Sequence, residues 1–319
     1  MLMTFDKTAE LINSGKLLHI AGTGDLLKKL PKGNWVGGST EYFMANDGCK
    51  VSGDLLFVSV FTYDNFSIKA YDASDINSVA ADAYDNGFSI VIVPFDSSVH
   101  KEYAENAAGF KDMFIKNIAG WVAGVNLNKP GQSPLTVNGI TGDIFTGGAV
   151  ALHMEVPADK TVSVNILNIF EQDEASPVIE FTEEGFQAKT CVIDGKEWNF
   201  AEYISQKSID TKLPLVGDYS GHGINISFKS IDDDVVNFYA PVFKGIRYRI
   251  AKTIPSYEDE FHKQLTKLAE IKSEFTCNCI LNFLYCELEG KRVQSEGPIT
   301  FGEIAYQLVN QTLVYITVV

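Results

Sequence analysis

The chain has 319 residues, enough for about two domains with a substantial core. Hydrophobic residues make up 45% of it and charged residues 21%, with 21 Phe and 13 Tyr, which excludes disorder over most of the length. The formal net charge is −15, so we expect neither nucleic-acid binding nor attachment to an anionic membrane surface.

The N-terminal segment 1–7 lacks the charged and apolar regions of a signal peptide. No apolar run reaches the roughly 18–20 residues that cross a bilayer. An odd number of scattered cysteines does not make a disulfide framework; these are Cys49, Cys191, Cys277, Cys279 and Cys286. We therefore expect a cytoplasmic protein of bacterial type.

The first half alternates strands and helices. Apolar spacing of three and four predicts helices over residues 4–14, 25–30, 75–84 and 97–118. Strands are predicted over 17–21, 55–61, 66–71 and 89–93. Residues 34–36 lead into a glycine turn, Gly37-Gly38-Ser39-Thr40.

From Leu135 onward strands dominate. They are predicted over 149–156, 161–170, 178–181, 186–193, 224–230, 235–239, 248–251, 275–288 and 313–318. Helices are predicted over 198–205 and 256–271. A turn at 301–304 precedes the last strand.

This order of elements predicts an α+β protein with mixed or antiparallel sheets covered by helices. A new strand–turn–helix unit begins after residues 183 and 184. We therefore place the domain boundary there, which gives domains 1–182 and 183–319. The short motif Gly-x-x-Thr occurs at Gly37–Thr40 and again at Gly297–Thr300, which suggests duplication of one segment.

The Gly37–Thr40 turn is the first candidate site. Glycines let a backbone approach a ligand, and successive N–H groups, here those of Gly38, Ser39 and Thr40, can hold a carboxylate. The alternative is a tight turn without a ligand. No Gly-Lys-Ser/Thr follows, so the segment is not a phosphate-binding P-loop.

Cysteine chemistry is the second candidate. Cys277 could act as a nucleophile with His222 as its base, although His222 is also explained by a polar turn before the strand at 224. Cys277 and Cys279 would share one face of a strand, with Cys286 nearby, but structural zinc takes four ligands and a fourth has no source. We predict no metal and no cofactor.

Several motifs resemble FIST sensory domains, in order along nearly the whole chain. Leu26-Leu27-x-x-Leu30-Pro31 followed by Trp35–Glu41 is similar to the early motif of the FIST N-terminal half. Four further segments are similar to motifs of the FIST C-terminal half. They are Cys191–Lys196 with Tyr203, Phe275–Asn278, Gly297–Ile304 and Asn310-Gln311-Thr312. The arginine common after the Phe275 motif is absent, and Ser-Thr-Glu-Tyr replaces Ser-Thr-x-Gly-Glu, so the chain looks like a divergent branch.

The resemblance implies an intracellular sensory module that binds a small molecule, such as an amino acid, and acts through a separately encoded signalling protein. Domain 1–182 would be FIST N-terminal-like and domain 183–319 FIST C-terminal-like. We expect the ligand between the two halves, at Gly37, Gly38, Ser39 and Thr40 and at a facing turn of Gly302 and Glu303, with Glu303 receiving a cationic group. Cys277 and Asn282 are secondary candidates. The alternatives are a cysteine-dependent enzyme for a small metabolite and a scaffold that only assembles with other proteins.

Overall fold

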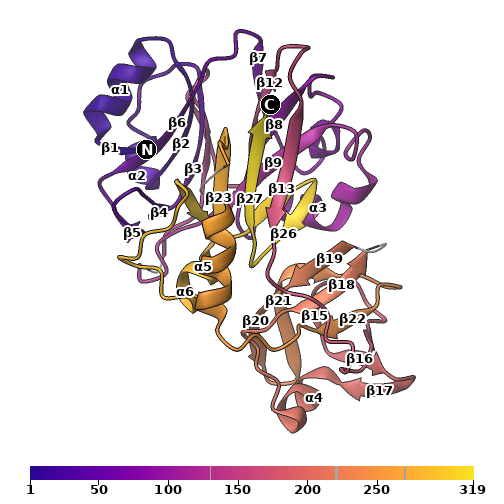
Figure 1. Ribbon diagram of the computed structural model, residues 1–319. Coiled ribbons are helices and arrows are strands. Elements are labelled where there is room, and N and C mark those ends of the chain that lie inside the picture. The colour runs from indigo at the N-terminus through magenta and orange to yellow at the C-terminus, as the bar shows by residue number, and fades with distance from the viewer. Residues whose placement is uncertain (130, 220–221, 269–270) are drawn as a thin grey trace. The chain divides into compact units, whose positions relative to one another are not determined.

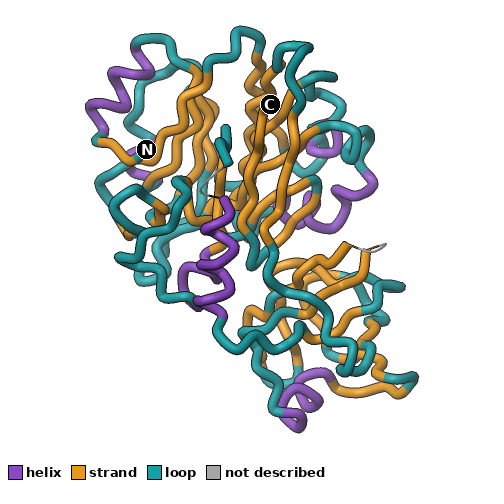
Figure 2. Tube along the Cα trace, viewed as in Figure 1, coloured by secondary structure: helices purple, strands orange, loops and turns teal. Residues whose placement is uncertain are grey.

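The computed structural model describes residues 1–129, 131–219, 222–268 and 271–319, without the side chains of His222 and Leu268. It confirms an α+β fold of mixed sheets and helices (Figure 2). The chain forms two compact units: unit 1 is Met1–Leu167, Phe261–Leu308 and Thr312–Val319, and unit 2 is Asn168–Glu260 and Val309–Gln311. These units do not coincide with segments 1–182 and 183–319, because the chain leaves unit 1 after Leu167 and returns to it at Phe261.

Unit 1 contains one strand arrangement three times. Figure 1 labels many of its strands, among them β2, β3, β8, β9, β23 and β27. The first repeat contains β2 (Leu17–Gly22), α2 (Gly24–Leu27), β3 (Trp35–Ser39), β4 (Tyr42–Met44), β5 (Lys50–Val51), β6 (Leu56–Phe61) and β7 (Phe66–Tyr71). It is preceded by β1 (Leu2–Met3) and α1 (Phe5–Asn13) and followed by the 3-10 turn η1 (Ile76–Ser78).

The second and third repeats follow the same order. The second contains β8 (Gly87–Pro94), α3 (Ser98–Asn106), η2 (Ala107–Gly109), β9 (Asn117–Ala123), β10 (Thr136–Asn138), β11 (Asp143–Phe145), β12 (Ala149–Glu155) and β13 (Val162–Leu167). The third, after α5 (Tyr257–Leu268), contains β23 (Phe275–Cys279), α6 (Ile280–Tyr285), β24 (Gly297–Thr300), β25 (Glu303–Ala305), β26 (Gln307–Val309) and β27 (Leu313–Val318).

The first and second repeats lend strands to the sheets of both other repeats, and the third lends β25 and β26 to the sheet of the second. The sheet orders are β1-β6-β2-β3-β10-β11, β7-β12-β8-β9-β25-β26 and β13-β27-β23-β24-β4-β5. In every sheet the third and fourth strands are parallel, and the fifth strand pairs antiparallel with the fourth and comes from another repeat. β1, at the start of the chain, is the edge strand beside β6. It takes the position that β7 has beside β12 and that β13 has beside β27. The arrangement is therefore a closed cycle of three.

The core of unit 1 has two kinds of region. One is apolar and lies where α1 and α2 cover the first sheet, with Ile12, Leu18, Ile20, Leu27, Leu30, Trp35, Leu56, Val58, Leu135 and Val137 buried together. The other lies where side chains of different sheets meet. There Trp121 of β9 donates from Nε1 to Nε2 of His19 on β2 at 2.9 Å, and the ring of Phe275 on β23 packs edge-on against His19.

Unit 2 is built from two further sheets, β17-β16-β14-β22-β18-β19 and β15-β21-β20. Their strands are β14 (Ile179–Glu180), β15 (Gly185–Ala188), β16 (Thr190–Ile193), β17 (Lys196–Asn199), β18 (Leu215–Tyr219), β19 (His222–Ile226), β20 (Phe228–Asp232), β21 (Val235–Val242) and β22 (Tyr248–Ile250), with the helix α4 (Phe200–Lys207). An aromatic cluster forms the core: Phe181, Phe200, Phe228, Phe238 and Tyr248.

Three sequence-based assignments are wrong. The helix expected over 97–118 ends at Asn106, because Gly109 and the left-handed Asp112 (φ 65°) follow, and residues 117–123 form β9. The strand expected over 275–288 ends at Cys279 and continues as α6, since an apolar run that is buried throughout has no period that distinguishes strand from helix. Residues 75–84 form only the short η1.

Two further expectations change in detail. Gly37–Ser39 is not a turn but the end of strand β3, between β2 and β10. The predicted strands 55–61 and 66–71 are present as β6 and β7, but they belong to different sheets. None of the helices in the described ranges combines the length and apolar character needed to cross a membrane.

Gly120 lies where two strands of unit 1 approach each other closely, so a substitution there tests this packing. It lies on β9 beside Val91 of the parallel strand β8, and a Cβ at this position would overlap the backbone of Val91. We expect Gly120→Ala to lower the free energy of unfolding by about 3 kcal/mol or more. Urea denaturation measures this. Gly147→Ala is the control, because its Cβ would have no atom within 4 Å; equal effects of the two changes would contradict the packing described.

Candidate functional site

Ser39 and Thr40 lie where β3 ends and the chain crosses to another sheet. The Ser39 hydroxyl donates to Gly124 O at 2.8 Å and accepts from Leu135 N, and Thr40 Oγ1 donates to Ile299 O at 2.8 Å. Their backbone N–H groups donate to Leu135 O and Gly22 O at 2.9 Å. These N–H groups are therefore occupied within the fold, and the carboxylate contact that we expected from them does not fit the structure.

Gly37 and Gly38 have a packing role in β3. A Cβ on Gly38 would lie 2.6 Å from Ile92 and 2.8 Å from the Trp121 ring, and one on Gly37 would lie 2.9 Å from Ile20 O. The absence of side chains here lets β3 approach its neighbours. Neither glycine lines a cavity described below.

A cavity of about 530 Å³ begins at this junction, and we call it the Ser39 cavity. Ser39 and Thr40 form part of its wall, and charged side chains surround them: Asp25, Lys28, Lys29, Glu41 and Lys129. The volume is in the range of small-molecule sites. Its location at the ends of parallel strands, where loops carry polar groups, is typical of ligand sites in sheets with crossover helices.

Glu41 is the most buried charged group of the Ser39 cavity, with a side chain only 4% exposed. Lys129 Nζ lies 2.8 Å from Glu41 Oε2, and Asn126 Nδ2 donates to the same oxygen at 2.8 Å. Within the described residues, the other oxygen, Oε1, has no hydrogen bond, and Lys28 and Lys29 form no ion pair. The cavity thus offers one carboxylate oxygen and two lysines to a ligand.

Glu303 lies elsewhere in unit 1 and is completely buried. Its carboxyl group is within 3.0 Å of Thr300 Oγ1 and 2.8 Å of Thr312 Oγ1. Burial raises the pKa of Glu303 to about 8, although hydrogen bonds from Thr312, Thr300 and Cys279 lower it. Since Thr300 Oγ1 also lies 3.2 Å from Asn278 O and has one hydrogen, it can donate to Asn278 and accept from a protonated Glu303.

A neutral, enclosed Glu303 does not suit a cationic ligand. It lines none of the cavities described, and neither does Gly302, whose φ of 147° and contact with Val122 require glycine. Of the eight residues expected to bind a ligand, only Ser39 and Thr40 line a described cavity together. The two Gly-x-x-Thr segments occupy corresponding strand ends, on β3 and β24, without facing one cavity.

Cys277 and Asn282 also have structural partners. Cys277 Sγ donates to Gly120 O at 3.4 Å, and burial raises the pKa of its thiol well above the ordinary value. Asn282 Nδ2 donates to Asn278 Oδ1 and Thr312 O, which joins α6 to β23. The side chain of His222, the expected base, lies outside the described residues. Among those that are described, no three His, Cys, Asp or Glu side chains are placed to hold a metal ion.

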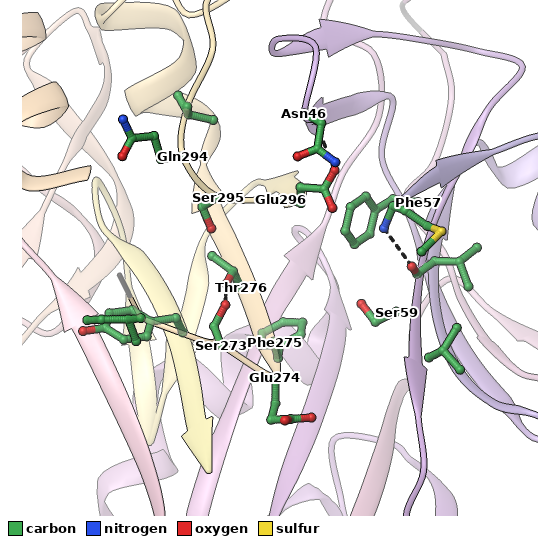
Figure 3. A pocket seen from close by; sticks show the side chains of 16 residues that line it. Asn46, Phe57, Ser59, Ser273, Glu274, Phe275, Thr276, Gln294, Ser295 and Glu296 are labelled. Carbon is green, nitrogen blue, oxygen red and sulfur yellow. Dashed lines mark hydrogen bonds between the residues drawn. The ribbon is translucent and has the colours of Figure 1, made fainter. Parts of the chain in front are cut away.

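A second cavity of unit 1, of about 480 Å³, lies between β6 and β23, and we call it the Ser59 cavity (Figure 3). Ser59 Oγ lies 3.4 Å from Nδ1 of His19, whose Nε2 accepts from Trp121. An indole N–H only donates, so His19 carries its proton on Nδ1 and donates to Ser59. Burial lowers the pKa of His19 to about 3, so the ring is neutral and is not a base for Ser59.

Among the residues that the structure describes, Ser89 and His153 form the shortest hydroxyl–imidazole contact, 2.7 Å to Nδ1, and the Tyr71 hydroxyl bonds the other ring nitrogen. Both residues are completely buried, and burial lowers the pKa of His153 to about 4. Neither lines a described cavity, so this pair is part of the core.

Most of the charged residues in the wall of the Ser39 cavity were not predicted from the sequence. Lys129 and Asn126 come from the loop after β9, which was not predicted as a strand, so nothing connected them with Glu41. Glu41 itself directly follows Ser39 and Thr40. The polar triplet Ser39-Thr40-Glu41 directly follows a buried strand, and this pattern is the signal from which Glu41 could have been predicted as a site residue.

The buried Glu303 should make stability depend on pH. Its folded pKa of about 8 exceeds the ordinary 4.5, so the folded state holds an extra proton between these values and loses stability as pH rises through them, by roughly 1.4 kcal/mol per pH unit. Glu303→Gln remains neutral at every pH. We expect it to be increasingly more stable than the wild type from pH 5 to pH 8 in urea denaturation, and a constant difference would contradict the raised pKa.

The buried thiols should be unreactive. All five cysteines are reduced and buried, and burial raises the pKa of Cys49 and Cys191 to about 12. Since the thiolate is the nucleophile, iodoacetamide near neutral pH should leave Cys277 unmodified in the folded protein and modify it in urea. Mass spectrometry of the digested protein measures this. Rapid modification of folded Cys277 would instead support a cysteine-dependent enzyme.

Comparison with proteins of known family places the whole chain in one group. The family model described as "Family of unknown function (DUF6976)" matches residues 3–319. Neither curated proteins nor solved structures gave a match to the chain. The protein with this three-repeat unit and its Ser39 cavity belongs to the DUF6976 family.

Proposed function

We propose that this protein is a small-molecule-binding sensory module that takes a zwitterionic metabolite, such as an amino acid, in the Ser39 cavity. The observation that carries the proposal is the unbonded Oε1 of Glu41, in a wall that also presents Lys28 and Lys29. An ammonium group would bind Glu41, and a carboxylate would bind the lysines.

The geometry of Glu41 favours this ligand class. Lys129 and Asn126 both hold Oε2, so the carboxylate is oriented before a ligand arrives and its remaining oxygen is positioned. A charged hydrogen bond to a group so little exposed is stronger than one at the surface. Lys28 and Lys29 are exposed, which suits the end of the ligand that enters last.

The sensory part of the proposal rests on the resemblance to FIST domains. In this reading the module acts in the cytoplasm, without catalysis of its own, and passes its ligand-bound state to a separately encoded signalling protein. The five reduced cysteines are compatible with a reducing compartment. The ligand position replaces the one expected from sequence, because Glu41 rather than Glu303 supplies the acidic group.

Thermal unfolding in the presence of each proteinogenic amino acid tests the proposal. A ligand that binds only the folded protein stabilises it by about 2.7 kcal/mol at a hundredfold excess over Kd. We expect at least one amino acid to raise the Tm, and Glu41→Gln to abolish the increase because the anionic oxygen is lost.

Lys28→Met combined with Lys29→Met should weaken the same response. Lys7→Met is the matched control, because Lys7 is an exposed lysine on α1 outside the Ser39 cavity. The proposal fails if no amino acid raises the Tm, or if Glu41→Gln responds as fully as Lys7→Met.

A further inference from the structure

Unit 2 has a cavity of its own, of about 630 Å³, which we call the Tyr203 cavity. α4 lies beside the hairpin β16–β17, and both contribute to its wall (Figure 1). Cys191–Lys196 and Tyr203 form one of the sequence motifs described above, and the fold brings Asp194 of the hairpin turn and Tyr203 of α4 to the same wall. The volume is in the range of small-molecule sites.

Tyr203 brings a buried hydroxyl group to this wall. The residue is only 5% exposed, and its ring packs edge-on against Trp198. Among the residues that the structure describes, none forms a hydrogen bond with the Tyr203 hydroxyl. Burial raises the pKa of Tyr203, and the nearby Cys191 and Asp194 raise it further, so the phenol keeps its proton. Polar groups that are so little exposed normally have a hydrogen-bond partner, which the fold does not supply here.

Asp194 is held at the cavity by the turn that joins β16 to β17. Ile193 pairs with Lys196 across the turn, and Asp194 and Gly195 have φ angles of 50° and 79°. Within the described part of the chain, the Asp194 carboxylate makes no hydrogen bond or ion pair. Asp194 and Tyr203 are therefore neighbours that bond neither each other nor another described residue, so a donor group between them can bond both.

The rest of the wall combines acidic and apolar side chains. Asp173 and Asp210 each accept a backbone N–H at 3.0 Å with one oxygen, which fixes their position. Lys207 is the one cation among the described lining residues, so the three aspartates outnumber it. Leu213 and Ala251 add the apolar surface, since both belong to a hydrophobic cluster of unit 2. A cation with an aliphatic part matches this wall better than an anion does.

We propose that the Tyr203 cavity binds an alkylguanidinium ligand, with its guanidinium group between Asp194 and the Tyr203 hydroxyl and its alkyl chain against Leu213 and Ala251. A guanidinium group presents five N–H donors in one plane, so it donates to a carboxylate and to a phenolic oxygen together. An ammonium group is a more strongly hydrated point charge and suits a partly apolar wall less well. This site is independent of the zwitterion site proposed at Glu41.

Isothermal titration calorimetry of the full chain with butylguanidine at low salt tests the proposal. We expect binding, and a loss of about tenfold in affinity for Tyr203→Phe, because one hydrogen bond to a charged group is removed. Tyr203→Phe keeps the ring. Since the hydroxyl bonds no described residue, the Tm of the ligand-free chain should stay the same, whereas a purely structural role of the hydroxyl would lower it.

Asp194→Asn removes the charge but suits the left-handed backbone of the turn, which asparagine tolerates. We expect it to weaken binding by about tenfold. Asp233→Asn is the matched control, because Asp233 is exposed, has a φ of 54° in the turn between β20 and β21, and does not line the Tyr203 cavity. It should bind butylguanidine as tightly as the wild type does.

Two further probes make the test independent of how well the variants fold. On the wild-type chain, butylamine should bind about tenfold more weakly than butylguanidine, and butylurea, which is planar but neutral, should give no binding heat. The proposal is overturned if butylguanidine does not bind, if butylurea binds equally well, if Tyr203→Phe binds as tightly as the wild type, or if Asp233→Asn weakens binding as much as Asp194→Asn.

Discussion

The exchange of strands between repeats is the constraint on which unit 1 depends. Each parallel pair, β2–β3, β8–β9 and β23–β24, would leave the N–H and C=O groups of its second strand unpaired. The strands β10, β25 and β4, each from another repeat, pair with those edges. Because an open strand edge is costly and prone to association, no repeat of unit 1 is complete by itself.

The junctions created by this exchange explain the polar residues at strand ends. Ser39 and Thr40 join the end of β3 to Gly124 and Ile299, which belong to the other two repeats. Their hydroxyl groups are first of all structural. The Ser39 cavity exists because the chain must turn away from the first sheet at this point, so the junction also supplies a wall for a ligand.

Desolvation determines the charge state of the groups inside unit 1. His19 and Glu303 are both enclosed, and both are neutral near pH 7 because water no longer stabilises their charged forms. Glu41, Glu274 and Glu296 differ from these two residues because they line the walls of cavities. This contrast separates titratable residues that hold the fold together from those available for binding.

The sequence alone was sufficient for the α+β class and for elements with a clear period or clear ends, such as α1 and β27. The glycine and hydroxyl segment at Gly37–Thr40 was also recognisable as a special point of the chain. β9 is buried over most of its length and shows no alternation, and it was not predicted as a strand.

Only the tertiary structure decided which side chains share a cavity. Lys129 and Glu41 are far apart in sequence and meet because the loop after β9 passes the end of β3. The threefold cycle and the burial that neutralises Glu303 both depend on pairing between distant strands. Local patterns report periodicity and turns, whereas burial and charge pairing are properties of the assembled sheets.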